Sequence, residues 1–395
     1  VGERADASGT QSTAIGRASI ANKSRTTALG ASSKATRDQA TAIGVQANAS
    51  ASRSIALGSF SNSSGQLSQA IGSNATASGE NSSAIGSFAN ASAKEATAIG
   101  HLSVASGVDS SAFGKGANAS ALEATAVGYE AKASGEDSSA FGKEANASGS
   151  ESTAVGYEAK ASADDSSAFG YEANASGNGS IALGYQSISS DTYATALGAS
   201  SNASNQSATA IGASANASGV YSTSIGMQTR ANGGGSLSAG YLAVAEFNFA
   251  TALGSGALGG SISATAVGHQ AKANYSNSSA IGASAITTRA DQLMLGKTET
   301  EVTVANLANS SQARNAIVVA NEDGTLSRYE VGGSTFNSLN CTGNGTNAVC
   351  YGPGANATGQ NTTAIGAGAT AATASNSTDF GATAIGANSN ASAAN

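Results

Sequence analysis

Residues 82–86 read Ser-Ser-Ala-Ile-Gly, and the pair that ends this stretch, a large apolar residue followed by glycine, recurs every 14 positions from Ile15-Gly16 to Leu295-Gly296. Twenty such intervals separate Gly16 from Gly296, so 21 copies stand in register. Only Ala239-Gly240 lacks a large apolar residue. A period held over this length indicates a solenoid in which each copy stacks on the one before it, because a copy of another length would break the stack.

Side-chain alternation within each copy predicts two short strands. In residues 82–86, Ile85 and Ser83 fall on one face of a strand and Ala84 falls on the other. The second half of the copy, Ala-Asn-Ala-Ser at 89–92, alternates small apolar and polar residues and predicts another strand before a turn. Each coil would then hold two strands of about five residues and two tight turns, with coils roughly 4.8 Å apart in a rod on the order of 100 Å long.

The predicted coil has very little apolar material to bury. Alanine stands two positions before the glycine in 18 of the 21 copies, the exceptions being Ser224, Ser238 and Met294, and this predicts a close approach of backbones. One large apolar side chain per coil contributes about 1.5–3 kcal/mol, whereas ordering each backbone residue costs about 1 kcal/mol or more. We therefore expect the apolar face to pack against identical chains in a cyclic homo-oligomer.

The composition argues against several classes of partner. The chain has 25 acidic and 18 basic residues, a net charge of -7, and no stripe of lysine and arginine to neutralise phosphates, so nucleic acid is not expected as a partner. No run of about 18 apolar residues occurs, so no membrane-spanning helix is expected. The chain opens inside a repeat without a signal peptide, and we interpret it as a fragment of a longer protein.

The repeat resembles the head repeat of trimeric autotransporter adhesins of the YadA type. The resemblance lies in Ser-x-Ala-Ile-Gly and its variants followed by alternating Ala, Asn and Ser, as at residues 152–156 and 145–149, and it covers residues 1–296 nearly continuously. It implies an all-β fold, a left-handed parallel β-roll solenoid formed by a homotrimer. It also implies a coiled-coil stalk and an outer-membrane β-barrel anchor outside this sequence, and hence a place on the bacterial cell surface.

The same resemblance implies a function in attachment without catalysis. Relatives bind collagen-like or fibronectin-like host matrix proteins, host cell-surface receptors or abiotic surfaces, and the matching strands here include residues 12–16, 82–86 and 278–282. Two alternatives stay open, an ice-binding β-solenoid and a phage fibre shaft. Hydroxyl residues such as Thr13 and Thr27 recur three positions before the glycine and could order water. They share a face with the large apolar residue, however, and are therefore expected to be buried.

The period lapses at Lys297, which divides the chain into three parts. Residues 1–296 form the repetitive head, residues 297–340 are expected to form a β-rich connector, and residues 341–395 a second head segment. In the connector, the tetrapeptide Asn-Glu-Asp-Gly at 321–324 separates two alternating stretches and predicts a β-hairpin.

The repeats resume in the last part with one irregular interval. The interval from Ile365-Gly366 to Ile385-Gly386 is six positions longer than the period, and this excess predicts a protruding loop at 372–379. Cys341 and Cys350, the only cysteines, flank a stretch that can turn tightly, and in an exported protein we expect them to form a disulfide. Such a ring would stabilise the fold by roughly 2–3 kcal/mol. The alternative is two free thiols in a reducing compartment.

No catalytic, metal or cofactor site is expected. His101 and His269 each follow a repeat glycine in distant coils, where an exposed turn residue is the simplest interpretation. The cysteine spacing does not fit a CxxC site, and the cysteines have no nearby histidine. The glycine-rich nonapeptide of calcium-binding repeats is also absent from the sequence.

The position directly after the repeat glycine carries the main candidate for a ligand site. Stacked coils would align its side chains into one exposed stripe, made of Lys115, Tyr129, Lys143, Tyr157, Tyr171 and Tyr185. The following position adds Glu130, Glu144, Glu158, Glu172 and Gln186. Exposed tyrosines are good binding anchors because they offer area at a low cost in rotamer entropy. The alternative is a cross-coil ladder of aromatic and charge pairs that only stabilises the solenoid.

Asparagine recurs four positions after the glycine, each time with Ser or Thr two residues later. These asparagines are Asn48, Asn62, Asn90, Asn118, Asn146, Asn174, Asn202, Asn216, Asn356 and Asn390. They match the glycosylation sequon. An unmodified ladder of side-chain amides or a turn residue explains them equally well.

Overall fold

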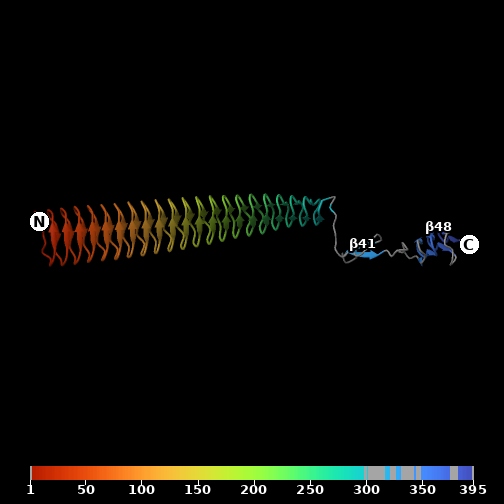
Figure 1. Ribbon diagram of the computed structural model, residues 1–395, viewed down its shortest axis with the longest axis horizontal. Helices are drawn as coiled ribbons and strands as arrows, with labels where there is room; N and C mark the ends of the chain where they lie inside the picture. Colours follow the sequence, from red (N-terminus) through yellow and green to blue (C-terminus); the bar gives the residue numbers. More distant parts are fainter. Residues whose placement is uncertain are drawn as a thin grey trace. The chain divides into compact units, whose positions relative to one another are not determined.

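The computed structural model describes residues 2–297, 300, 316–320, 326–330, 342–343, 348–373 and 381–393. The chain divides into two units, Val1–Thr300 and Glu301–Asn395. The first unit is an all-β parallel solenoid whose coils follow one another along a rod (Figure 1). No helix long and apolar enough to span a membrane occurs among the described residues.

Each coil of the first unit contributes one strand to each of two parallel sheets. Three-residue strands follow one another at the period of the repeat from β1 (Thr13–Ile15) to β39 (Ser279–Ile281) and β40 (Leu293–Leu295), and form a sheet of 21 strands. Two-residue strands follow at the same interval from β2 (Ile20–Ala21) to β38 (Lys272–Ala273). The predicted parallel solenoid is confirmed, although its strands are shorter than expected.

Strand pairing joins equivalent residues of neighbouring coils without a shift of register. In β11 (Ser83–Ile85), Ala84 pairs with Ala70 on one side and Ala98 on the other. In β12 (Asn90–Ala91), Asn90 pairs with Thr76 and Val104. Each position of the repeat therefore forms a column along the rod, so a residue type that recurs in the sequence becomes a surface stripe or a core stack.

Two backbone requirements explain the glycine in every copy. Gly86 has a φ of 133°, a conformation that residues with a side chain rarely adopt, and a Cβ built on it would lie 2.5 Å from the carbonyl oxygen of Gly100. The same close approach to the next glycine of the column recurs at Gly58 and Gly198. Glycine is thus needed both for the bend and for the coil spacing.

Between the short strands, each coil has two turns, and the backbone of these turns also forms hydrogen bonds with the neighbouring coil. Every seventh residue, such as Phe88 and Glu95, has a φ near 57°, and where this residue is not glycine it is never β-branched. This follows because β-branched side chains tolerate the left-handed region least. The backbone N–H of Phe88 donates to the carbonyl of Ser73 at 2.9 Å, and that of Glu95 to the carbonyl of Glu80 at 2.8 Å. Hydrogen bonds between coils therefore continue through the turns.

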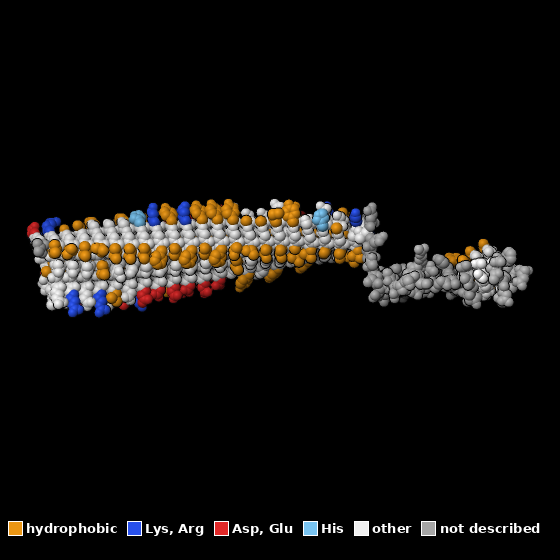
Figure 2. Space-filling view, viewed as in Figure 1, with side chains coloured by type: hydrophobic (Ala, Val, Ile, Leu, Met, Phe, Trp, Pro, Cys, Tyr) orange, Lys and Arg blue, Asp and Glu red, His pale blue; other side chains and the backbone are white. Residues whose placement is uncertain are grey.

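The interior of the rod is built from alanine and small hydroxyl residues. The largest fully buried side chains of the described chain are threonines and Cys350, and alanines such as Ala84 and Ala91 are completely inaccessible. The large apolar residue before each glycine points outward, with Ile15 45% and Leu183 45% exposed. These residues form the continuous apolar row along the middle of the rod in Figure 2.

The hydroxyl column shares the outward face of the apolar row. Thr27 and its equivalents are half-buried in this single chain and Thr13 is exposed, so the expected burial is only partial here.

The described residues of the second unit form a hairpin and three further coils. Strand β41 (Ala316–Ala320) pairs antiparallel with β42 (Leu326–Glu330). Strands β44 (Val349–Tyr351), β46 (Thr363–Ile365) and β48 (Thr383–Ile385) form one parallel sheet. The other parallel sheet contains β43 (Thr342–Gly343), β45 (Asn356–Thr358), β47 (Thr370–Thr373) and β49 (Asn390–Ala393). Ala372, the first residue of the predicted loop, belongs to β47, and residues 374–380 lie outside the described residues.

Candidate functional site

The turns form two edges of the rod, and the predicted ligand stripe lies on one of them. We call the residues one and two positions after each repeat glycine the first edge, and the residues seven to nine positions after it the second edge. On the first edge, Lys115, Tyr129, Lys143, Tyr157, Tyr171 and Tyr185 occupy one column, because strand pairing is in register. The predicted alignment is present, and Figure 2 shows alternating basic and apolar side chains along this upper edge.

The last three tyrosines of the stripe form a continuous stack. The rings of Tyr157 and Tyr171 are parallel within 6°, with centroids 4.9 Å apart, and those of Tyr171 and Tyr185 are parallel within 12° at 5.2 Å. This separation is close to the spacing of neighbouring parallel strands. The coil repeat therefore sets the stacking distance, and each ring covers a face of its neighbour.

The first half of the stripe alternates cations and rings. The Lys143 ammonium lies 4.9 Å from the centroid of the Tyr157 ring and 5.8 Å from that of Tyr129, and the Lys115 ammonium lies 5.3 Å from that of Tyr129. Lys143 also forms an ion pair with Glu144 at 3.2 Å. Cation–π contacts thus continue the ladder that the stacked tyrosines complete.

The glutamates beside the stripe raise the pKa of three of its tyrosines. Hydrogen bonding to Glu130 raises the pKa of the Tyr129 hydroxyl, and Glu158 and Glu172 raise the pKa of Tyr157 and Tyr171 in the same way. Hydrogen bonding to Glu144 raises the pKa of Lys143. Tyr129, Lys143, Tyr157 and Tyr171 therefore hold their protons more tightly than the same side chains do in water.

The stacking decides which parts of the stripe a ligand can reach. Since the faces of Tyr157 and Tyr171 are covered by neighbouring cations or rings, their edges and hydroxyls remain accessible. Tyr185 ends the stack, is 52% exposed, and is followed in its column by the small Ala199. The geometry thus contains the stabilising ladder that was the alternative interpretation, and it leaves a row of phenol edges on the surface.

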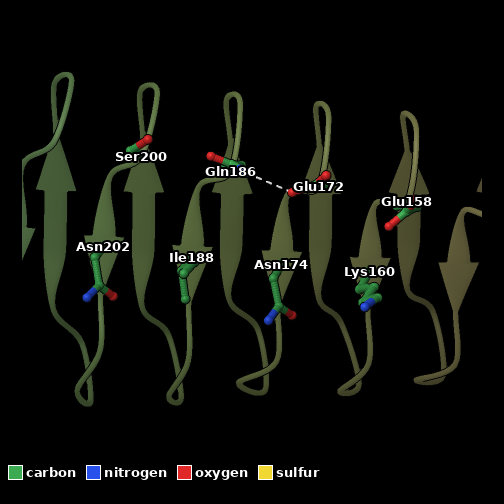
Figure 3. A pocket seen from close by; sticks show the side chains of 8 residues that line it. All are labelled: Glu158, Lys160, Glu172, Asn174, Gln186, Ile188, Ser200 and Asn202. Atoms are coloured by element: carbon green, nitrogen blue, oxygen red, sulfur yellow. Dashed lines mark hydrogen bonds between the residues drawn. The ribbon is translucent and has the colours of Figure 1, made fainter.

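A groove of about 570 Å³ runs beside the tyrosine stack over four coils. Its first wall is made of first-edge residues and its second wall of the two-residue strands, and the lining residues, labelled in Figure 3, are Glu158, Glu172, Gln186, Ser200, Lys160, Asn174, Ile188 and Asn202. The Gln186 amide donates to the Glu172 carboxylate at 2.8 Å across neighbouring coils. The residues of the first wall follow the residues of the stripe column by one position in the sequence, and those of the second wall follow them by three. Because strand pairing is in register, this groove could have been predicted from the sequence.

The asparagine column lies on the two-residue strands. The Asn48 amide donates to the Asn62 carbonyl oxygen at 2.9 Å, which is one rung of the expected amide ladder. The side-chain oxygens of Asn118, Asn202 and Asn216 are enclosed and have no partner among the described atoms.

The remaining predicted residues take no part in a common site. His101 is exposed and meets the Phe88 ring edge-on at 6.3 Å, and His269 is exposed in a distant coil. Cys350 is buried in β44, and the described part of the chain has no free cysteine. Cys341 lies outside the described residues, so its pairing with Cys350 stays a prediction. Within the described ranges, no group of three or more metal-binding side chains occurs.

The second edge carries features that the sequence interpretation missed. Basic side chains at Lys23, Arg25, Arg37 and Arg53 are followed by an acidic row, which is interrupted by Lys94, paired with Glu95 at 3.3 Å. The row consists of Glu80, Glu95, Asp109, Glu123, Glu136, Asp137, Glu151, Asp164 and Asp165. Aromatic side chains follow at Tyr193, Tyr221, Phe247, Phe249 and Tyr275. Figure 2 shows the same order of blue, red and orange along the lower edge. Sorting the sequence by position in the repeat would have revealed these blocks.

Comparisons with known proteins place the chain in a family. The model of the YadA head domain repeat (2 copies) matches residues 7–33, 35–61, 63–89, 91–117, 119–145, 147–173, 175–201, 203–229, 231–257, 261–285, 344–369 and 357–378. No curated protein matches the chain. Among solved structures, the collagen-binding domain of Yersinia adhesin YadA shares 19% identity over 62% of this chain and 82% of that chain, with a TM-score of 0.13, too low to support a structural argument. Because the repeat model matches well over half of the residues, the chain belongs to the family of YadA head domain repeats.

Proposed function

We propose that this chain is the trimeric head of a bacterial cell-surface adhesin, held on the outer membrane by a stalk and anchor outside this sequence. It attaches, without catalysis, to extracellular matrix proteins, host receptors or abiotic surfaces. Membership of the YadA head repeat family supports this role. The solved structure with 19% identity is described as a collagen-binding domain, which makes collagen the first matrix protein to test.

The outward apolar row is the observation that supports the trimer. Leu57, Phe113 and Ile225 are between 38% and 41% exposed in the single chain, and equivalent residues follow at nearly every coil. A contiguous apolar surface of this length marks an interaction site. Covering the exposed part of each side chain would contribute on the order of 1 kcal/mol per coil. In a closed ring of three chains, every copy of the apolar row would be covered by a neighbouring chain.

The first-edge stripe is the surface that we propose for adhesion. Stacking and cation–π contacts fix Tyr129, Tyr157, Tyr171 and Tyr185 before any ligand arrives, so little rotamer entropy remains to be lost on binding. A trimer would repeat the stripe three times, and weak contacts would then add through avidity. The groove beside the stack extends the same surface.

Adhesion of a matched pair of variants tests this proposal. Replacing Tyr129, Tyr157, Tyr171 and Tyr185 by Ser should lower binding to collagen-coated, fibronectin-coated or plastic surfaces by about tenfold or more. Sedimentation should give three chains of 37.8 kDa for both variant and parent. A control with Tyr193 and Tyr221 replaced by Ser removes tyrosines from the second edge and should adhere normally. Unchanged adhesion of the first variant, with native circular dichroism, would refute a role for the stripe.

The ice-binding alternative rests on the hydroxyl column of the three-residue strands. Large apolar side chains such as Leu29 and Ile43 follow the hydroxyl residues Thr27 and Thr41 two positions further on and share their face. A flat array of hydroxyls is therefore not available, and no thermal hysteresis is expected. The phage-fibre alternative predicts the same rod and differs in its flanking sequence.

A further inference from the structure

In the second-edge column nine positions after the repeat glycine, three aromatic residues recur at every second coil. Tyr193, Tyr221 and Phe249 are spaced by two periods of the repeat, and the same column holds small residues in the coils between and beside them, namely Gly179, Ser207, Gly235 and Ser263. The three aromatic residues are 67%, 63% and 68% exposed. They are the most exposed aromatic side chains of the first unit, since Phe60 and Phe88 are 51% and Tyr185 is 52% exposed. Large exposed apolar side chains of this kind mark candidate interaction sites.

The small residues give the rings a defined seat. A Cβ added to Gly179 would lie 2.9 Å from Cδ1 and Cε1 of Tyr193, and one added to Gly235 would lie 3.2 and 3.4 Å from the same atoms of Phe249. One edge of each of these two rings therefore rests on the glycine of the preceding coil. The alternation of large and small residues thus fixes ring positions about 9.6 Å apart, which is two strand spacings.

The faces of these rings remain open. No ring stacks on them among the described residues, in contrast to Tyr157 and Tyr171, whose separation is 4.9 Å. All three residues occupy the left-handed turn position, with φ values of 56°, 56° and 61°. The three rings therefore leave the turn from the same backbone conformation and form a row of exposed apolar platforms along this edge.

The surroundings of the row are nearly uncharged and hold both polar side chains and the exposed apolar residues Val220, Phe247 and Ile262. Asn178, Gln206 and Asn248 are exposed beside the rings. The Asn248 side-chain oxygen accepts the N–H of Gly234 at 2.8 Å, and this hydrogen bond orients the side-chain NH2 group. Asp191 is the one charged residue of the second edge between 177 and 263, and its carboxylate accepts the N–H of Thr192 at 2.7 Å. Glu246 directly precedes the second-edge residue Phe247 in the sequence.

We propose that this aromatic row binds an extended, uncharged, β-linked polysaccharide. In such a glycan successive sugars alternate in orientation along a flat ribbon, so the same face recurs at every second sugar, a repeat close to two coils of the rod. The C–H groups of each face would pack on Tyr193, Tyr221 or Phe249, and amides such as Asn248 would bond hydroxyls at the ribbon edge.

The charge pattern selects against other polymers. The acidic row at Glu123, Asp137, Asp164 and Asp165 lies on the same edge before the aromatic row, so a polyanion such as a nucleic acid or a sulfated glycan would be repelled. A neutral ribbon with the repeat of the rings fits both the spacing and the charge.

Retention of the full chain on insoluble glycans tests the proposal. The parent should bind cellulose or chitin powder and should not bind amylose, whose α-linked chain coils. The triple variant Tyr193→Ser, Tyr221→Ser and Phe249→Ser should lose about tenfold or more of this binding. Serine already occupies the same backbone conformation at Ser207, so the fold should be retained.

Two further variants separate this site from the first edge and from general stickiness. Replacing Tyr157, Tyr171 and Tyr185 by Ser removes as many rings and should leave glycan binding intact while it lowers matrix adhesion. The combination of Ser207→Tyr and Tyr221→Ser keeps three rings but destroys their spacing, and it should lose binding as the triple variant does.

Several results would overturn the inference. They are no retention of the parent on either glycan, equal retention of the triple variant, or undiminished binding by the respaced variant. Retention on polystyrene or on a protein-coated surface, with none on cellulose and chitin, would show apolar adsorption or a protein ligand instead. Matrix adhesion measured on the same samples keeps a failure here distinct from a failure of the proposed adhesin role.

Discussion

The two edges of the rod share one backbone and differ in how often an aromatic residue recurs. On the first edge tyrosines in successive coils stack at 4.9 and 5.2 Å, so they cover one another. In the second-edge column of Tyr193, Tyr221 and Phe249, rings at every second coil have no stacking partner among the described residues and stay more than 60% exposed. The sequence interval between aromatic residues, one period or two, therefore decides whether a ring stabilises the solenoid or remains open to a ligand.

The largest expected effect comes from the glycine column that sets the coil spacing for both edges. Gly86→Ala places a Cβ 2.5 Å from the Gly100 carbonyl oxygen in a left-handed conformation, and we expect a loss of more than about 2 kcal/mol. Gly256→Ala is the matched control, because its Cβ would meet only the Gln270 side chain at 3.4 Å. Chemical denaturation should show a loss of about 1 kcal/mol for this control. Equal losses would mean that the close approach between coils does not set the spacing.

A smaller effect should distinguish the two edges directly. Tyr171→Ser removes a ring that stacks on both Tyr157 and Tyr185, and it should lower Tm by roughly 1–3 °C. Tyr221→Ser removes a ring of similar size without a stacking partner and should change Tm by less than about 1 °C. Differential scanning calorimetry of both variants measures the contrast. A larger loss at Tyr221 would show that the second-edge rings have a structural role.

Much of this architecture could be predicted from the sequence. The pairing of Ile85 and Ser83 on one face and Ala84 on the other follows from alternation, and the column of tyrosines follows from the period. The strand length could not be predicted, because turn residues such as Phe88 use their N–H groups for bonds between coils and so leave only short strands on either side. The aromatic row was missed because its interval spans two repeats.

The smallest expected effect concerns the acidic row of the second edge and its dependence on pH. The negative charge of Asp137 raises the pKa of Glu123 above its usual value of 4.5, with additional effects from desolvation and from Asp109 and Glu136. A raised folded-state pKa contributes stability that is fully present below the unfolded pKa and is lost as pH rises through the folded value. Acidification from neutral pH toward 4.5 should therefore raise Tm slightly. Glu123→Gln should raise Tm at neutral pH and weaken the change of Tm with pH. Glu3→Gln removes a carboxylate outside the row and should have neither effect. A parent whose Tm falls steadily over the same range, or a Glu123→Gln variant with the parent's pH profile, would show that repulsion along this edge is screened by solvent and has no effect on the fold.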